Sequence, residues 1–158
     1  MKYIKKNIMT VRSGYILNLC NCVSLKPCGR AEDMEKAFPG TCPYLIGRFY
    51  IPGTVFLIES NKGPTIINLF GQRYSEGPCV CVDSCDTEQD REKYFKQGLE
   101  SLVEYFSGTE EVVKIAVPYK IGCEYGQGYW PRYKDILEEF ETEMIDKGMS
   151  MELTMYGF

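Results

Sequence analysis

The chain has 158 residues and contains no histidine. Histidine is the side chain that most often serves as a general base near neutral pH, and it is the commonest ligand of transition metals. Its absence excludes every catalytic device that depends on an imidazole. Proton transfer or metal binding in this protein would have to use carboxylates, thiols or amides.

Long apolar runs are also missing, since no stretch approaches the length of about 20 residues that spans a bilayer. The first six residues, Met-Lys-Tyr-Ile-Lys-Lys, lack the apolar segment of a signal peptide. We therefore expect a cytoplasmic protein with no membrane partner.

An excess of positive charge is absent as well, because the net charge is −4 and the isoelectric point is near 5.0. General nucleic-acid binders usually carry a basic stripe that neutralises phosphates, so this class of function is disfavoured. The apolar and charged fractions are ordinary for a globular protein. The length fits one domain over residues 1–158, which we expect to be a monomer.

Cysteine, in contrast, is plentiful, with eight residues. A chain of this size does not need disulfides for stability, so we expect reduced thiols that pack as small apolar groups. A four-thiolate zinc site drawn from Cys20, Cys22, Cys79, Cys81 and Cys85 is the alternative. Because structural zinc sites usually use Cys-x-x-Cys spacing, we expect no metal and no other cofactor.

The hydrophobic pattern predicts alternating strands and helices. Strands are expected over residues 2–9, 15–20, 54–58, 65–70, 112–117 and 151–156, and helices over 29–38, 90–106 and 130–144. The turn between the third and fourth strands predicts a hairpin. Residues 74–87 read as a surface loop beside a site. The predicted fold class is α/β, with a mixed sheet covered by helices on both faces.

One junction is the strongest local sign of function. Residues 118–130, Pro-Tyr-Lys-Ile-Gly-Cys-Glu-Tyr-Gly-Gln-Gly-Tyr-Trp, join an apolar strand to an amphipathic helix through a glycine-bearing turn. Glycines let backbone amides crowd around an anion, and the following helix adds the positive end of its dipole. The junction predicts a phosphate site, although tight strand-to-helix turns contain glycine for structural reasons too.

Four segments occur in a recognisable order: residues 16–22, residues 26–31 with Phe-Pro at 38–39, residues 68–72 and residues 118–130. Together they resemble the macro domain family, in particular its compact branch with ADP-ribose 1''-phosphate phosphatases and phage-encoded relatives. Residues 16–22, Ile-Leu-Asn-Leu-Cys-Asn-Cys, resemble that branch's Ile-Ala-His-Gly-Cys-Asn-Cys. Residues 26–31, followed by Phe-Pro at 38–39, resemble its first glycine loop and helix. Residues 68–72 match Asn-Leu-Phe-x-Gln, and residues 118–130 match Pro-Tyr-Lys-Ile-Gly-Cys-Gly-Leu-x-Gly-Gly-Asp-Trp.

The resemblance implies a three-layer α/β/α sandwich with a mixed sheet of about six strands, whose pocket at the strand carboxyl ends binds ADP-ribose or a derivative. Asn21 matches the asparagine that holds the distal ribose, and Asn7 occupies the position of the aspartate that contacts adenine. The diphosphate would lie between the loop containing Gly122, Cys123, Gly126 and Gly128 and an opposite wall containing Gly29 and Ala31. The implied partners are a small ADP-ribose derivative or an ADP-ribosylated macromolecule.

The sequence departs from this pattern where hydrolysis would need proton transfer. Asn18 replaces the family histidine, and Tyr129 replaces an aspartate. Glu124 and Gln127 replace glycines of the second loop. Glu124 is the candidate substitute base, acting with Asn21 as the ribose-positioning residue, although a loop glutamate most often faces solvent. Two functions therefore stay open: hydrolysis of ADP-ribose 1''-phosphate or of ADP-ribosyl bonds, and binding without turnover.

Overall fold

The computed structural model describes residues 1–75, 85–124 and 126–157. Its strands are β1 (Lys2–Ile4), β2 (Tyr15–Asn21), β3 (Val55–Glu59), β4 (Thr65–Gln72), β5 (Val113–Pro118) and β6 (Met151–Tyr156). Its α-helices are α1 (Arg30–Ala37), α2 (Glu88–Phe106) and α3 (Trp130–Asp146), and two short 3-10 helices are η1 (Ile8–Thr10) and η2 (Pro43–Ile46).

The strands form one mixed six-stranded sheet in the order β1-β6-β5-β2-β4-β3. All neighbours pair in parallel except β3 and β4, which form the predicted antiparallel hairpin. β2 lies between β4 and β5, so the carboxyl ends of these three parallel strands meet at one edge of the sheet. Open sheets of this kind place ligands beyond that edge.

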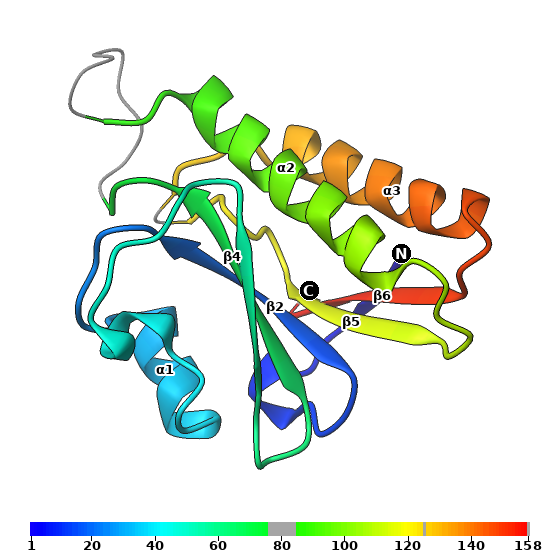
Figure 1. Cartoon of the computed structure of the whole chain (residues 1–158), viewed down its shortest axis with the longest axis horizontal. Coiled ribbons are helices and arrows are strands. Elements are labelled where there is room, and N and C mark those ends of the chain that lie inside the picture. Colours follow the sequence, from blue (N-terminus) through cyan, green and yellow to red (C-terminus); the bar gives the residue numbers. More distant parts are fainter. Residues whose placement is uncertain (76–84, 125, 158) are drawn as a thin grey trace.

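Helices cover both faces of the sheet, which confirms the predicted three-layer sandwich. Figure 1 shows α2 and α3 side by side on one face and α1 on the other. The larger apolar core lies under α2 and α3, and two smaller clusters lie on the side of α1. The central strands β2 and β4 contribute buried side chains to both faces, as expected of strands covered on both sides.

The helix α2 forms where the apolar spacing predicts it. Phe95, Leu99 and Leu102 recur at helical spacing and are buried against the sheet. Its start is fixed by a capping box, in which Thr87 Oγ1 accepts from the Asp90 N–H and the Asp90 carboxylate accepts from the Thr87 N–H. These two bonds satisfy donors that the first turn would otherwise leave unpaired.

Two local predictions need correction. The strand expected over residues 2–9 ends at Ile4, because Asn7 caps a 3-10 turn by accepting the Met9 N–H on its side-chain oxygen. The 3-10 helix η2 follows α1 where no element was predicted. Most of the loop expected over residues 74–87, namely residues 76–84, lies outside the described residues.

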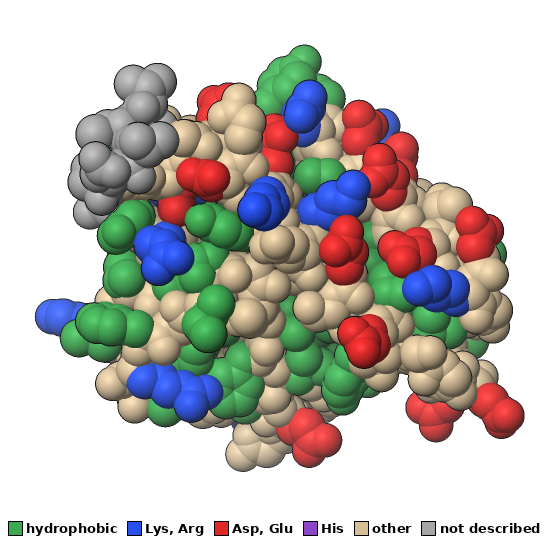
Figure 2. Space-filling view, turned by 45° about the horizontal axis from the view of Figure 1, so that its top comes forward, with side chains coloured by type: hydrophobic (Ala, Val, Ile, Leu, Met, Phe, Trp, Pro, Cys, Tyr) green, Lys and Arg blue, Asp and Glu red, His purple; other side chains and the backbone are tan. Residues whose placement is uncertain are grey.

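Negative charge is concentrated on the α2 and α3 face. These two helices carry eleven carboxylates against five basic side chains, a net −6, so the rest of the chain carries +2 of the total −4. Figure 2 shows many of these acidic side chains spread over the helical face, with apolar side chains gathered to one side. The net negative charge of the protein therefore comes from these two helices, and the rest of the chain is slightly positive. No helix in the described parts of the chain combines the length and apolar character needed to cross a bilayer.

Gly98 provides a test of how tightly α2 packs on β4. A Cβ atom at this position would lie 2.4 Å from Leu69 Cγ. Helix propensity alone predicts that Gly98→Ala stabilises by about 0.5–1 kcal/mol. Because the contact is in the core, we instead expect a loss of about 1–3 kcal/mol in the free energy of unfolding, measured by urea titration.

The matched control is Ser101→Ala, an exposed position on the same helix, which should change the unfolding free energy by less than about 0.5 kcal/mol. Stabilisation by Gly98→Ala would show that the helix can shift away from Leu69 at little cost.

Candidate functional site

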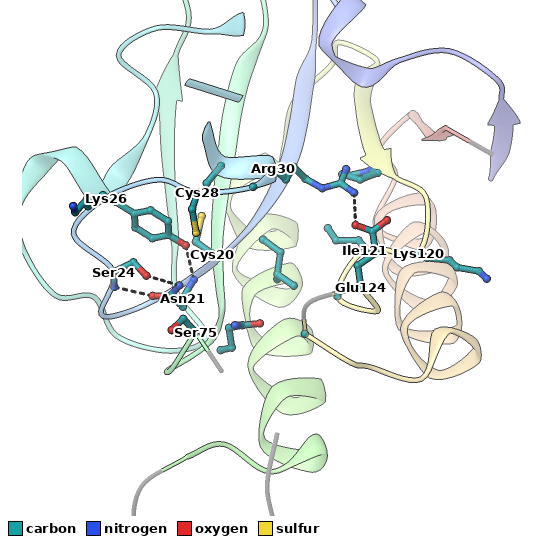
Figure 3. A pocket seen from close by; sticks show the side chains of 18 residues that line it. Cys20, Asn21, Ser24, Lys26, Cys28, Arg30, Ser75, Lys120, Ile121 and Glu124 are labelled. Carbon is teal, nitrogen blue, oxygen red and sulfur yellow. Dashed lines mark hydrogen bonds and ion pairs between the residues drawn. The ribbon is translucent and has the colours of Figure 1, made fainter. Parts of the chain in front are cut away.

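A cavity of about 360 Å³ opens at the edge where β2, β4 and β5 end. This volume lies in the range of small-molecule sites. We call it the central pocket; it is lined by Leu19, Cys20, Asn21, Ser24, Lys26, Cys28, Gly29, Arg30, Ala31, Tyr44, Gln72, Ser75, Pro118, Lys120, Ile121, Gly122, Glu124 and Gly126. Figure 3 shows that the lining residues come from both loops and from the strand ends.

Most of the site residues expected from the sequence are brought together here. The structure places Asn21, Gly29, Ala31, Gly122, Glu124 and Gly126 on the wall of the central pocket. Asn7 lies in a neighbouring hollow, which we call the Asn7 hollow and which shares Gly29, Arg30 and Glu124 with the central pocket. Cys123 and Gly128 are not among the lining residues of either cavity.

Asn21 is held by its own turn. Its side-chain Oδ1 accepts from the N–H groups of Val23 and Ser24 at 3.0 and 2.8 Å, and its Nδ2 donates to Ser24 Oγ at 2.9 Å. The Asn21 backbone N–H donates to the hydroxyl of Tyr44 at 2.9 Å. The turn-capping role of Asn21 is thus present, and its amide is fixed at the pocket wall with one N–H hydrogen left for a ligand.

The second glycine loop is shaped by close packing on α3. Gly122 has a φ of +79°, and a Cβ there would lie 2.6 Å from Tyr133 Cε1. Gly128 has the same limit, since its Cβ would meet Tyr133 Cε2 at 2.6 Å, and its N–H donates to Gly122 O at 2.9 Å. Gly128 is therefore explained by the turn itself, and its N–H is not available to a ligand.

Residues that line the central pocket on its two sides carry backbone N–H groups without a described acceptor. In the described parts of the chain, the N–H groups of Gly122 and Gly126 donate to no other residue. On the opposite wall, α1 has no side-chain cap, and the N–H groups of Arg30 and Ala31 at its start likewise have no described acceptor. Unpaired amides and a helix N-terminus attract anions, so the two walls together suit a phosphate-bearing ligand.

An ion pair bridges these two walls. Arg30 Nη2 lies 3.2 Å from Glu124 Oε2, and Figure 3 shows the two side chains pointing toward one another. The ammonium groups of Lys26 and Lys120 instead extend away from the cavity on opposite sides. Arg30 is therefore the cation placed between the walls, and Glu124 is its partner rather than a fully solvated loop residue.

A buried ion pair that was not predicted from the sequence holds the second glycine loop and the end of β4 in place. Arg91 Nε contacts Asp86 Oδ2 at 3.2 Å, with both side chains at most 3% exposed. Asp86 also accepts from the N–H groups of Arg73 and Tyr74, and Arg91 donates to the carbonyls of Tyr74 and Gly126. This network ties the start of α2 to the end of β4 and to the second glycine loop.

Tyr44 is a second residue that sequence reasoning missed. It comes from η2, is 6% exposed, and positions Asn21 through the hydrogen bond described above. Burial raises the pKa of Tyr44 above its ordinary value, so its hydroxyl stays protonated. Nothing in the local pattern distinguishes this tyrosine from the other eleven in the chain.

The cysteines divide by environment. Cys20, Cys22, Cys28, Cys42 and Cys123 are free, as expected, but Cys85 is disulfide-bonded, which corrects the expectation of reduced thiols throughout. Among the described residues no group of three Cys, Asp or Glu side chains is arranged to hold a metal. Cys79 and Cys81 of the zinc alternative lie outside the described residues.

Two of the positions that depart from the family pattern, Asn18 and Tyr129, do not line the pocket. Asn18 is buried, donates to Asn68 Oδ1 at 3.0 Å, and is absent from the pocket lining. Tyr129 precedes α3 with 63% of its surface exposed. Neither residue is placed to move a proton within the central pocket.

Comparison with known proteins identifies the fold. The chain aligns with the macrodomain of Mycobacterium tuberculosis DarG at a TM-score of 0.69 and 17% identity, over 97% of this chain and 95% of that one. It aligns with a mutant Oceanobacillus iheyensis macrodomain solved with ADPR at a TM-score of 0.60 and 14% identity, over 99% of this chain and 84% of that one. It aligns with a Trypanosoma brucei macrodomain in complex with ADP at a TM-score of 0.67 and 9% identity, over 98% of this chain and 61% of that one. No protein-family model and no curated protein matches the sequence. The chain therefore has the macrodomain fold.

Removing Asp86 should test the buried network. Asp86→Ala leaves the Arg91 charge buried without its carboxylate, and breaking such a pair costs about 3–5 kcal/mol. We expect a loss of that size in the free energy of unfolding, measured by urea titration. The control is Glu92→Ala, which breaks the Glu92–Arg132 pair, where the arginine is 62% exposed, and should cost less than about 1 kcal/mol. Equal losses in the two variants would contradict the structural role of Asp86.

Thiol alkylation should distinguish the exposed Cys28 from the partly buried Cys123 and the buried Cys22. Burial raises the pKa of Cys123 to about 11 and that of Cys22 to about 12. At pH 8 only about 0.1% of Cys123 is then thiolate, which is the reactive form. We expect iodoacetamide to modify the exposed Cys28 first, as read by peptide mass spectrometry.

Because each pH unit below a thiol pKa changes the thiolate fraction about tenfold, the Cys123 rate should rise about a hundredfold between pH 8 and pH 10. Cys28→Ser should abolish the fast phase. Modification of Cys123 as fast as that of Cys28 at pH 8 would contradict its burial.

Proposed function

We propose that this protein binds ADP-ribose or a close derivative in the central pocket. The observation that carries the proposal is the pair of facing walls with unpaired amides, at Gly122 and Gly126 on one side and at the start of α1 on the other. The same fold holds ADPR in the Oceanobacillus iheyensis structure and ADP in the Trypanosoma brucei structure. We further propose that the protein acts as a cytoplasmic monomer of a single domain.

The geometry suggests how each part of the ligand would be held. The diphosphate would lie between the two walls, where backbone N–H groups and Arg30 attract negative charge. The distal ribose would lie near the Asn21 amide. Adenine would lie in the Asn7 hollow, where Asn7 Oδ1 accepts from the Met9 N–H and keeps a lone pair for an amino group.

Binding without turnover is the form of this function that the site favours. Glu124 is the candidate general base, and its carboxylate is neutralised by Arg30 at 3.2 Å and is 61% exposed. A general base must be within hydrogen-bond reach of the proton that it takes, whereas this carboxylate is already engaged by the Arg30 guanidinium. Hydrolysis of ADP-ribose 1''-phosphate or of an ADP-ribosyl bond, with Glu124 as base and Asn21 as positioning residue, remains the second candidate.

Two measurements separate these candidates. Calorimetric titration with ADP-ribose measures binding, and incubation with ADP-ribose 1''-phosphate followed by phosphate detection measures turnover. Saturable binding without phosphate release is the expected result. Phosphate release that is lost in Glu124→Gln would instead establish the hydrolase, and absence of ADP-ribose binding would overturn the proposed function.

Asn21→Asp tests the position of the ligand while keeping the turn. The substituted carboxylate still accepts from the Val23 and Ser24 N–H groups, but it loses the amide donor and adds a negative charge to the pocket wall. We expect the dissociation constant for ADP-ribose, measured by calorimetry, to rise at least about tenfold, which corresponds to about 1.4 kcal/mol.

The matched control is Asn61→Asp, the same chemical change at an exposed turn between β3 and β4. Its affinity should stay within about twofold of the original protein. An unchanged affinity in Asn21→Asp would mean that the ribose does not reach Asn21.

A further inference from the structure

The Arg30–Glu124 ion pair lies on the wall shared by two cavities that one ligand would occupy together. Arg30 begins α1 and Glu124 lies in the loop between β5 and α3, 94 residues away in sequence. Both residues line the central pocket, and both line the Asn7 hollow. A ligand that extends from one cavity to the other must therefore pass this pair.

The pair is weak enough to be opened by a ligand. The Arg30 and Glu124 side chains are 36% and 61% exposed, and exposed pairs of this kind contribute little to stability. A phosphate can form two parallel hydrogen bonds with a guanidinium group, and such charge-assisted contacts are stronger than a single-contact ion pair. A ligand phosphate thus competes with Glu124 for Arg30.

We propose that Arg30 and Glu124 together determine ligand specificity by charge, with Arg30 attracting the phosphates of a ligand and Glu124 opposing them. This inference rests on the proposed function, because it assigns the passage between the two cavities to a diphosphate. Glu124 opposes the binding of an anion in two ways. Before binding, it is paired with the Arg30 guanidinium, and after binding its carboxylate repels the phosphate. Only ligands with enough phosphate contacts to offset both effects bind tightly.

Charge-neutral variants of each residue test this assignment. Glu124→Gln removes the competing charge, so we expect its dissociation constant for ADP-ribose to fall about three- to tenfold in 20 mM salt. Arg30→Gln removes the attracting charge, so its dissociation constant should rise about tenfold. Both differences should shrink in 500 mM salt, because mobile ions screen exposed charges. Calorimetry measures the binding of ADP-ribose and of inorganic pyrophosphate to the original protein, to these two variants and to a control variant.

The control variant is Glu92→Gln, which neutralises the carboxylate of another Arg–Glu pair, between Arg132 on α3 and Glu92 on α2. It should bind both probes as the original protein does. Because Arg30 and Glu124 are on the surface, their variants should melt within about 2 °C of the original protein, which a thermal scan checks.

The outcomes distinguish this inference from the proposed function. If ADP-ribose binds, but Glu124→Gln does not lower its dissociation constant or Arg30→Gln lowers it as much as Glu124→Gln does, the charge assignment is wrong. The binding function then stands. If ADP-ribose fails to bind and pyrophosphate still follows the expected order of variants, the charge assignment stands and the proposed function is wrong. If neither probe binds the original protein or Glu124→Gln, both are overturned.

Discussion

The parallel pairing of β2 with β4 and β5 is the constraint on which the site depends. Because the three strands run in the same direction, they end together, at Asn21, Gln72 and Pro118, and all three residues line the central pocket. Parallel strands also require connections that cross a face of the sheet, and these crossovers bring the N-terminus of α1 and the second glycine loop to the same edge. The topology therefore gathers at this edge the backbone donors that have no acceptor among the described residues.

The elements that positioned this edge were predictable from the sequence because they depend on local periodicity and turns. The stripe of Phe95, Leu99 and Leu102, the hairpin before β4 and the apolar run of β5 each produced the expected element. The prediction of a strand over residues 2–9 was wrong beyond Ile4, because the Asn7 side chain caps a turn that the alternating sequence does not indicate. The position of η2 depends on tertiary contacts of Tyr44, which no local signal records.

The site was predictable in part, and the missing part is the buried charge. Arg91 precedes Phe95 by four residues and therefore stands on the apolar stripe of α2. A charged residue on a buried stripe needs a partner, since an unpaired buried charge is strongly unfavourable. That argument predicts a buried ion pair, but it does not name the partner: Asp86 is five residues away and is oriented by the Arg73 and Tyr74 amides. Only the folded chain brings these groups together.

The departures from the macro domain pattern differ in what they change. Gln127 replaces a glycine and adopts a φ of 55°, so the loop keeps the left-handed conformation at an expected cost of about 1–2 kcal/mol. Glu124 has no positive φ, so a glutamate in place of glycine leaves the backbone unstrained and adds a negatively charged side chain. Arg30 offsets that charge across the pocket. The loop backbone thus accommodates both substitutions, and the side chains of Arg30 and Glu124 place a balanced pair of charges on the wall of the central pocket.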